Sequence, residues 1–405
     1  MIYLDNASTT NKKPLCVKWA VLKSLSKKYC ANPGRSSHKI GLNAGNVVFE
    51  TREKLQKFFN CQNAQNVVFT SGCTEALNLA ILGTVQKGKN VVYTSNEHNS
   101  VARPLEMLKN KKLITTTQVL TDQNGKTNPE DVEKAITEKT YLVIVNHTSN
   151  VTGATSDISK IGEICKKHNI MLLVDGAQSA GHQKIDMQKD NISMLAIAGH
   201  KGMLALQGVG ALLFADGVKI RPQKFGGTGT FSEQLLPPIT YPESLEAGTS
   251  PTPAIFSLFA STSYVSKHFD KINDKIHKLT KYLLTEMFKR KKLEIYTPKN
   301  CYNGVVSFNI KNILPSEVVD YFNQNGICIR AGLHCAPLCH NKLGTTKHGG
   351  AVRVSISHFN HMWEIKKFIR LLDKLLENMH WFAYKNVIKY IAYGERFKRI
   401  FDWPI

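Results

Sequence analysis

Two short segments of the sequence place polar residues where a buried strand is expected to end. The first, Ser-Gly-Cys-Thr-Glu at 71–75, lies between an expected strand and an expected helix, whose free N–H groups can bind an anion such as phosphate. In the second, Asp175 follows the apolar run 170–174, so its carboxylate would enter the crevice at the edge of a parallel sheet and could pair with a protonated ring nitrogen. Each segment alone is equally explained as a capped strand-to-helix turn.

A lysine and a cysteine are the candidate nucleophiles. Lys201 lies among small residues in Ala-Gly-His-Lys-Gly at 198–202, where burial would favour the neutral amine that forms Schiff bases, although an exposed loop lysine is the commoner case. Cys335 lies on a Gly- and Pro-bounded loop directly after His334 and five residues after Arg330, surroundings that favour the thiolate. The same loop carries four side chains of the kind that bind zinc: His334, Cys335, Cys339 and His340. Their spacing fits no standard structural zinc site, so we predict no metal.

The order of these segments resembles that of one enzyme family. A phosphate loop, an Asp after a strand, a Lys 26 residues later and then a reactive Cys resemble the cysteine desulfurases and selenocysteine lyases, which are pyridoxal-phosphate (PLP) enzymes of the class V aminotransferase type. The resemblance covers residues 3–360, nearly nine-tenths of the chain. It also rests on Tyr-Leu-Asp-Asn-Ala-Ser-Thr-Thr at 3–10, Asn-Pro-Gly-Arg-Ser-Ser-His at 32–38, Glu-His-Asn-Ser at 97–100, Ser-Asn-Val-Thr-Gly at 149–153, Glu-Ala-Gly-Thr at 246–249 and Val-Arg at 352–353.

The resemblance implies a role for each of these residues. Lys201 would hold PLP covalently and take the Cα proton of the substrate, Asp175 would pair with the pyridinium nitrogen, and His98 would stack on the ring. Cys335 would accept the sulfur. The other cofactor-binding residues would be Gln178 at the phenolic oxygen and, at the phosphate, Gly72, Cys73, Thr74, His200 and Thr249, the last from the second subunit of a homodimer. Arg353 would clamp the substrate carboxylate, and the further substrate-binding residues would be Asn150, His38 and Arg330.

Three features of this sequence differ from the common pattern of that family or select a branch of it. Related enzymes often have a hydroxyl residue where Ala198 stands and Thr where Cys73 stands, so one or two phosphate hydrogen bonds would be missing or supplied by backbone. Only 15 residues separate Cys335 from Ala351, which favours the branch with a compact Cys loop. Enzymes of that branch tend to be slow alone and to need a protein that takes the sulfur.

The implied activity is removal of sulfur from L-cysteine, giving L-alanine and a persulfide on Cys335. Selenocysteine lyase, with the same site, is the nearest alternative. Another aminotransferase or lyase is less expected, because Cys335 would then have no catalytic role. An inactive sulfur-relay or scaffold protein is also less expected, because it would not require Lys201, Asp175 and Arg353 together.

The elements expected around these residues indicate an α/β protein. Apolar runs at 67–69, 90–94, 141–146, 170–174 and 209–214 alternate with helical patterns, as in a parallel sheet covered on both faces. After about residue 255, a long helix at 254–292, strands at 305–310 and 351–357, and a helix at 363–376 indicate a smaller α+β domain. With the resemblance, this predicts a fold-type I PLP-dependent transferase with four parts: an N-terminal segment joining the small domain (1–15), a large PLP-binding domain (16–260), a small domain with the Cys loop (261–378) and an aromatic basic tail (379–405).

Composition excludes several other classes of protein. The 405 residues are 42% hydrophobic and 21% charged, as is ordinary for a globular protein, which excludes a mostly disordered chain. The formal net charge is +22. Short lysine clusters without a long basic arm indicate a solvated surface, so we expect no nucleic-acid partner. No apolar run approaches the length of a membrane span, and no signal peptide is recognisable.

Nine scattered cysteines indicate free thiols in a reducing, cytoplasmic environment. In the tail, Trp381, Tyr384, Ile388 and Ile391 would share a helical face, which we expect to dock on protein rather than on lipid.

Overall fold

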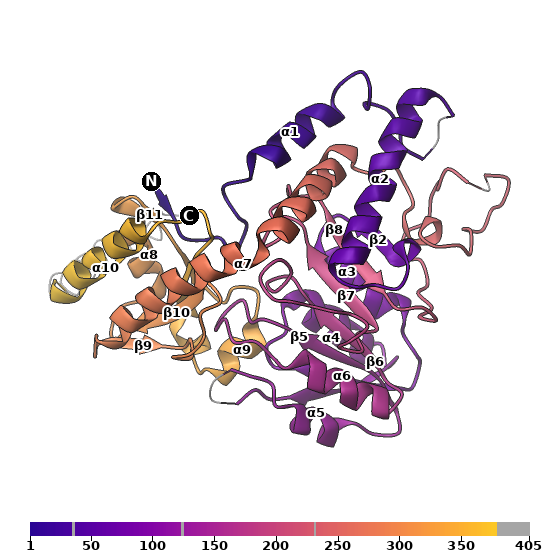
Figure 1. The fold of residues 1–405 in the computed structure, drawn as a ribbon. Helices are drawn as coiled ribbons and strands as arrows, with labels where there is room; N and C mark the ends of the chain where they lie inside the picture. Colours follow the sequence, from indigo (N-terminus) through magenta and orange to yellow (C-terminus); the bar gives the residue numbers. More distant parts are fainter. Residues whose placement is uncertain (35–36, 123–124, 231, 379–405) are drawn as a thin grey trace, which may run out of the picture.

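A seven-stranded sheet forms the centre of the larger part of the molecule (Figure 1). The computed structural model describes residues 1–378, apart from 35–36, 123–124 and 231. The strand order is β2-β8-β7-β6-β5-β3-β4, and β8 runs antiparallel to both of its neighbours while the other pairs are parallel. The strands are β2 (Val67–Thr70), β3 (Asn90–Thr94), β4 (Thr115–Val119), β5 (Thr140–Asn146), β6 (Met171–Asp175), β7 (Met194–Ala198) and β8 (Gly210–Phe214). The prediction of a mostly parallel α/β sheet is confirmed.

Helices cover both faces of this sheet because its strands are apolar on both sides. Along β5, Val143 and Val145 pack into one hydrophobic core, whereas Leu142 and Ile144 pack into another on the opposite face. The first core includes residues of α2 (Lys39–Phe58), α5 (Pro129–Ala135), α6 (Ile158–Lys167) and α7 (Thr252–Phe288). The second includes residues of α3 (Cys73–Gly83) and α4 (Asn99–Asn110). The carboxyl ends of the parallel strands are therefore framed by helices on both sides.

The smaller α+β part is built on an antiparallel sheet of order β12-β13-β10-β9. Its elements are β9 (Leu293–Ile295), β10 (Val305–Ile310), α8 (Pro315–Gln324), β12 (Arg330–Gly332), α9 (Pro337–Lys342), β13 (Ala351–Ser355) and α10 (Met362–Glu377). The N-terminal strand β1 (Ile2–Tyr3) pairs with β11 (Ile327–Cys328), and Asp5 forms a bridge with Ser355. The start of the chain thus lies against residues more than 300 positions later.

Two further helices pack against each other, and one of them connects the two parts of the molecule (Figure 1). Helix α1 (Leu15–Ser24) lies along α7, and α7 extends from the large sheet toward the small one (Figure 1). Helix α7 bends at His268, whose backbone angles are not helical, and it runs through position 260, where the sequence suggests a domain boundary. The domain limits 1–15, 16–260 and 261–378 stay a prediction.

The tail prediction lies outside the described residues, since 379–405 are not among them. Within the described part of the chain, no helix combines the length and the apolar character needed to cross a membrane.

Candidate active site

A cavity of about 230 Å³ lies at the carboxyl ends of β5, β6 and β7 and at the start of α3. Parallel α/β sheets bind their ligands at this edge. The residues lining it that the sequence singled out are Gly72, Cys73, Thr74, His98, Asn150, Asp175, Gln178, Ala198, His200 and Lys201. Nearly all of the cofactor-binding residues expected from one subunit are therefore gathered around one space.

One end of the cavity is suited to an anion. Helix α3 begins at Cys73 with Gly72 as its N-cap, and no side chain caps its first N–H groups. A helix N-terminus with free N–H groups attracts negative charge. The Thr74 hydroxyl is 2.8 Å from the Ser100 hydroxyl, and the buried Nδ1 of His200 has no partner among the described residues. Burial lowers the pKa of His200 to about 4, so this ring is a neutral hydrogen-bonding group at neutral pH.

The floor of the cavity holds one buried carboxylate, Asp175, at the end of β6. It accepts hydrogen bonds from the Ala177 N–H at 2.9 Å, from Asn146 Nδ2 at 3.4 Å and from the Cys73 thiol at 3.5 Å. Burial and the nearby Asp175 charge raise the pKa of Cys73 well above the ordinary value, so this thiol keeps its proton and donates it. Three donors thus orient the carboxylate toward a cationic ligand.

Lys201 follows β7 and lies at the cavity wall. Burial lowers its pKa, while the negative charge of Asp175 acts in the opposite direction. The backbone around it is tied to the start of the chain, because the Thr10 hydroxyl donates to the Lys201 carbonyl at 2.9 Å and the Thr10 N–H donates to the His200 carbonyl at 3.1 Å. A lysine with a lowered pKa releases its proton more readily, as Schiff-base chemistry requires.

His98 and Gln178 are both anchored by hydrogen bonds that leave their other polar atoms free to face the cavity. His98 is the N-cap of α4, and its Nδ1 accepts the Ser100 N–H at 3.1 Å, which places the ring proton on Nε2. Burial lowers the pKa of His98, so the ring is neutral. Gln178 donates its Nε2 to the Ala7 carbonyl at 2.9 Å.

Two backbone carbonyls of the Cys335 loop accept hydrogen bonds from residues that line or adjoin this cavity. The Asn99 N–H, beside His98, donates to the Cys335 carbonyl at 2.7 Å, and Asn150 Nδ2 donates to the His334 carbonyl at 2.7 Å. His334 and Cys335 both have positive φ, at 49° and 56°. The thiol of Cys335 is exposed, whereas that of Cys339 is buried. A compact, structured Cys loop is what the short spacing to Ala351 predicts.

The histidines of this loop bond to one another. His334 Nδ1 lies 3.3 Å from His340 Nε2, and His340 Nδ1 lies 2.7 Å from the Thr345 hydroxyl. Burial lowers the pKa of His334 to about 2 and that of His340 to about 4. Among the described residues, no three His, Cys, Asp or Glu side chains are arranged to hold a metal ion.

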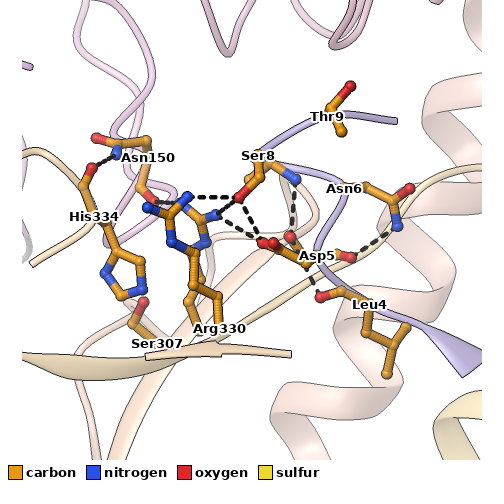
Figure 2. A network of polar contacts seen from close by, with 12 residues as sticks. Leu4, Asp5, Asn6, Ser8, Thr9, Asn150, Ser307, Arg330 and His334 are labelled. Carbon is orange, nitrogen blue, oxygen red and sulfur yellow. Dashed lines mark hydrogen bonds and ion pairs between the residues drawn. The ribbon is translucent and has the colours of Figure 1, made fainter. Parts of the chain in front are cut away.

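Two arginines lie beside Asn150 in a network with the N-terminal segment, part of which is drawn in Figure 2. Arg353 on β13 is 2% exposed, and its Nη1 donates to the Asn150 carbonyl at 3.1 Å. Its Nη2 donates to Asp5 at 2.9 Å, and Arg330 Nη1 donates to the Ser8 hydroxyl at 2.8 Å. Sequence reasoning missed Asp5 and Ser8 as site residues, although both lie in the segment 3–10 that carries part of the resemblance.

Five expected site residues are not among those that line the cavity. Three of them, Cys335, Arg330 and Arg353, have the contacts described above, and the other two are His38 and Thr249. His38 is exposed, and its Nδ1 accepts the Gly41 N–H at 3.2 Å as the N-cap of α2. Thr249 is exposed on the segment that leads to α7. Their suggested roles in binding substrate and phosphate stay predictions.

Comparison with known proteins agrees with this geometry. The aminotransferase class-V family model matches residues 2–368. The chain is 35% identical over 387 residues to a probable cysteine desulfurase of Methanothermobacter thermautotrophicus, covering 93% of this chain and 94% of the relative. It is 31% identical to a probable cysteine desulfurase of Pyrococcus abyssi, covering 94% and 95%. The apo structure of a cysteine desulfurase from Thermococcus onnurineus NA1 superposes with a TM-score of 0.85 at 29% identity, covering 93% of this chain and 95% of that one.

The match extends over nearly the whole of the sequence and of the fold, so it includes both the large sheet and the Cys loop. The predicted fold class, fold-type I, is confirmed by these relatives. This chain therefore belongs to the cysteine desulfurase family of the class-V aminotransferases.

Proposed function

We propose that this protein is a PLP-dependent cysteine desulfurase, which converts L-cysteine to L-alanine and leaves a persulfide on Cys335. One observation carries the proposal: Lys201 and the buried carboxylate of Asp175 line one cavity, and the loop that carries the exposed Cys335 is hydrogen-bonded to Asn150, which lines the same cavity. The backbone carbonyl of Cys335 also accepts a hydrogen bond from the N–H of Asn99, and the preceding residue, His98, lines that cavity. An aminotransferase would need the first two groups but not the third.

The residues of the cavity fit pyridoxal phosphate. The uncapped start of α3 and the unpaired Nδ1 of His200 suit a phosphate, and the buried Asp175 suits a protonated ring nitrogen. When bound, pyridoxal phosphate withdraws electrons from the Cα of an amino acid attached to it. Ala198 offers only a methyl group to the cavity, and the thiol of Cys73 is directed at Asp175. Backbone N–H groups would therefore hold most of the phosphate.

The protein's own groups would carry out the remaining steps. Arg353, with Arg330 and Asn150, would bind the substrate carboxylate, and the Lys201 amine would take the Cα proton. The thiolate of Cys335 would then attack the substrate sulfur, so that an S–S bond forms and the Cβ–S bond of the substrate breaks. The electron pair of that bond stays with the substrate Cβ, which takes up a proton. The Cα takes back the proton held by Lys201, and the product leaves as alanine. The persulfide on Cys335 retains the sulfur.

We infer that the enzyme acts as a homodimer and passes its sulfur to an acceptor protein. Exposed apolar side chains on α1 and on the segment 225–239 suit burial against a second copy: Leu15, Trp19, Leu22, Phe225, Leu235, Leu236 and Ile239. The exposed Thr249 lies ten residues beyond that segment, where a second subunit's phosphate site would meet it. The exposure of Cys335 gives an acceptor access to the persulfide. All nine cysteines are unpaired, which supports a reducing, cytoplasmic location.

The test is release of alanine and sulfide from L-cysteine, measured with and without a reducing acceptor and compared with L-selenocysteine. We expect turnover of L-cysteine by the PLP-loaded protein and none by a folded Lys201→Ala variant, with Lys289→Ala, an exposed lysine remote from the cavity, as the matched control. Turnover of selenocysteine alone would identify the selenocysteine lyase alternative. Turnover of neither substrate, or full activity of Lys201→Ala, would refute the proposal.

A further inference from the structure

Ser8 lies on an N-terminal segment that is held in place on both sides. The Tyr3 hydroxyl donates to the carbonyls of Asp5 and Thr9, both at 3.1 Å, so residues 5–9 form a closed turn. The Ala7 N–H donates to the Ser355 hydroxyl at 2.9 Å, which ties this turn to β13, the strand that carries Arg353. The Ser8 side chain is therefore presented to the site by a fixed backbone.

The Ser8 hydroxyl joins two guanidinium groups and one carboxylate. It accepts from Arg330 Nη1 at 2.8 Å and from Arg353 Nη2 at 2.9 Å, and it donates to Asp5 Oδ1 at 2.8 Å. Figure 2 shows Ser8 between Arg330 and Asp5. A hydroxyl has one proton to donate and two lone pairs to accept with, so all of its hydrogen-bonding positions are used.

The two guanidinium groups keep donors available for a ligand. Arg353 has five N–H bonds, of which three are directed at the Asn150 carbonyl, Asp5 and Ser8. Its buried Nε has no partner among the described residues. Within the described residues, the Arg330 side chain donates one N–H, to the Ser8 hydroxyl. Since Arg330 and Arg353 carry two positive charges and Asp5 one negative charge, the cluster has a net charge of +1, which one carboxylate would neutralise.

We propose that Ser8 is a positioning residue for the carboxylate of the substrate, because its hydroxyl holds Arg330 and Arg353 side by side so that both bind the same carboxylate. Two guanidinium groups repel each other, and the shared acceptor offsets this repulsion without adding a second negative charge. An aspartate at this position would make the cluster neutral, and an alanine would leave Arg330 without this anchor. This inference rests on the proposed function, since it concerns the amino-acid substrate of that reaction.

The experiment uses the PLP-loaded enzyme and the variants Ser8→Ala, Ser8→Asp and Ser8→Thr. The measurements are kcat and KM for L-cysteine, together with the dissociation constants of L-alanine and L-alaninamide from the absorbance of the holoenzyme. Ser8→Ala should raise KM for L-cysteine and the dissociation constant of L-alanine by about tenfold, with kcat changed less than twofold. Ser8→Asp should weaken both further, whereas Ser8→Thr should restore them.

L-Alaninamide separates positioning from general damage to the site, because it lacks the carboxylate. Its dissociation constant should stay within about twofold in all three variants. Ser26→Ala, at an exposed position two residues beyond the end of α1, is the matched serine control. An equal loss of L-alanine and L-alaninamide binding, or an unchanged affinity for L-alanine in Ser8→Ala, would overturn the proposal. If the wild-type protein failed to turn over L-cysteine, the proposed function would fall, while the alanine and alaninamide comparison would still decide the role of Ser8.

Discussion

Replacing the two cysteines of the active loop one at a time should separate the sulfur acceptor from its neighbour. Cys335 and Cys339 are four residues apart, yet the first is exposed and the second is 2% exposed against Val151, Ala336 and Leu343. We predict that Cys335→Ser lowers alanine release from L-cysteine by roughly a hundredfold or more, because a serine hydroxyl is scarcely ionised at neutral pH and attacks sulfur poorly.

Cys339→Ser should have little effect on turnover, because burial keeps the Cys339 thiol protonated. Burial raises the pKa of Cys339 to about 12, so that roughly one molecule in 10⁵ carries the thiolate at pH 7. A thiol with the reference pKa of 9.0 would have about one in 100, roughly a thousandfold more. Cys339 is therefore a poor nucleophile as well as an inaccessible one. Its replacement should cost about 1 kcal/mol of stability, because a more polar hydroxyl would be buried beside Val151 and Ala336 with Ser149 as its hydrogen-bonding neighbour, and should change kcat less than twofold.

The assay is alanine release in the presence of a reducing acceptor. In a separate sample without the acceptor, mass spectrometry of the intact protein detects the added sulfur atom. Wild type and Cys339→Ser should gain 32 Da after one turnover, about the mass of sulfur, and Cys335→Ser should gain nothing. Both variants should still bind PLP. If Cys339→Ser abolished turnover while Cys335→Ser did not, the assigned nucleophile would be wrong, and the burial argument with it.

Three further predictions concern stability and the cofactor. His147 is buried, and burial lowers its pKa in the folded state from 6.5 to about 4, so the unfolded chain binds more protons between these pH values. The free energy of unfolding should therefore fall as the pH drops from 6.5 toward 4, with a contribution from this residue of about 2 kcal/mol at pH 5. His147→Gln should flatten the pH dependence of the free energy of unfolding measured with urea. Arg52 forms a two-pronged ion pair with Glu246 at 2.7 and 2.5 Å, so Arg52→Leu should cost about 3–5 kcal/mol, and the double change with Glu246→Leu should cost less than Arg52→Leu alone. Ala198→Ser should slow PLP loss on dialysis a few-fold, because the hydroxyl adds a phosphate donor at the cavity wall; an unchanged loss rate would show that the phosphate does not reach this position.

The sequence by itself determined the elements whose pattern is local. Strands such as β5 and β6 are almost entirely apolar, because both faces of a parallel sheet are covered, and such runs stand out from the alternating helices. The edge strand β4, Thr-Thr-Thr-Gln-Val, carries no such signal, since its first four residues are polar and exposed or half-buried, and we did not predict it. Asp175 could be named because it follows an apolar run, and such positions open into the ligand crevice. Lys201 could be named because it lies among small residues, but we did not predict β7, the buried strand that it follows.

Only the tertiary structure decided which distant segments share the site. Asp5 and Ser8 meet Arg330 and Arg353 across more than 320 residues, through a pairing of β1 with β11 and a bridge from Asp5 to Ser355 that no local pattern encodes. The hydrogen bond from the Asn99 N–H, at the start of α4, to the Cys335 carbonyl likewise joins segments that are far apart in the chain. Burial of a cysteine is also a property of the packed loop: the sequence singles out Cys335 by its neighbours, but only the structure shows that Cys335 is exposed and Cys339 buried. Residue types and order thus specify which chemistry is available, whereas contacts between segments far apart in the chain fix the charge balance and the accessibility that direct it.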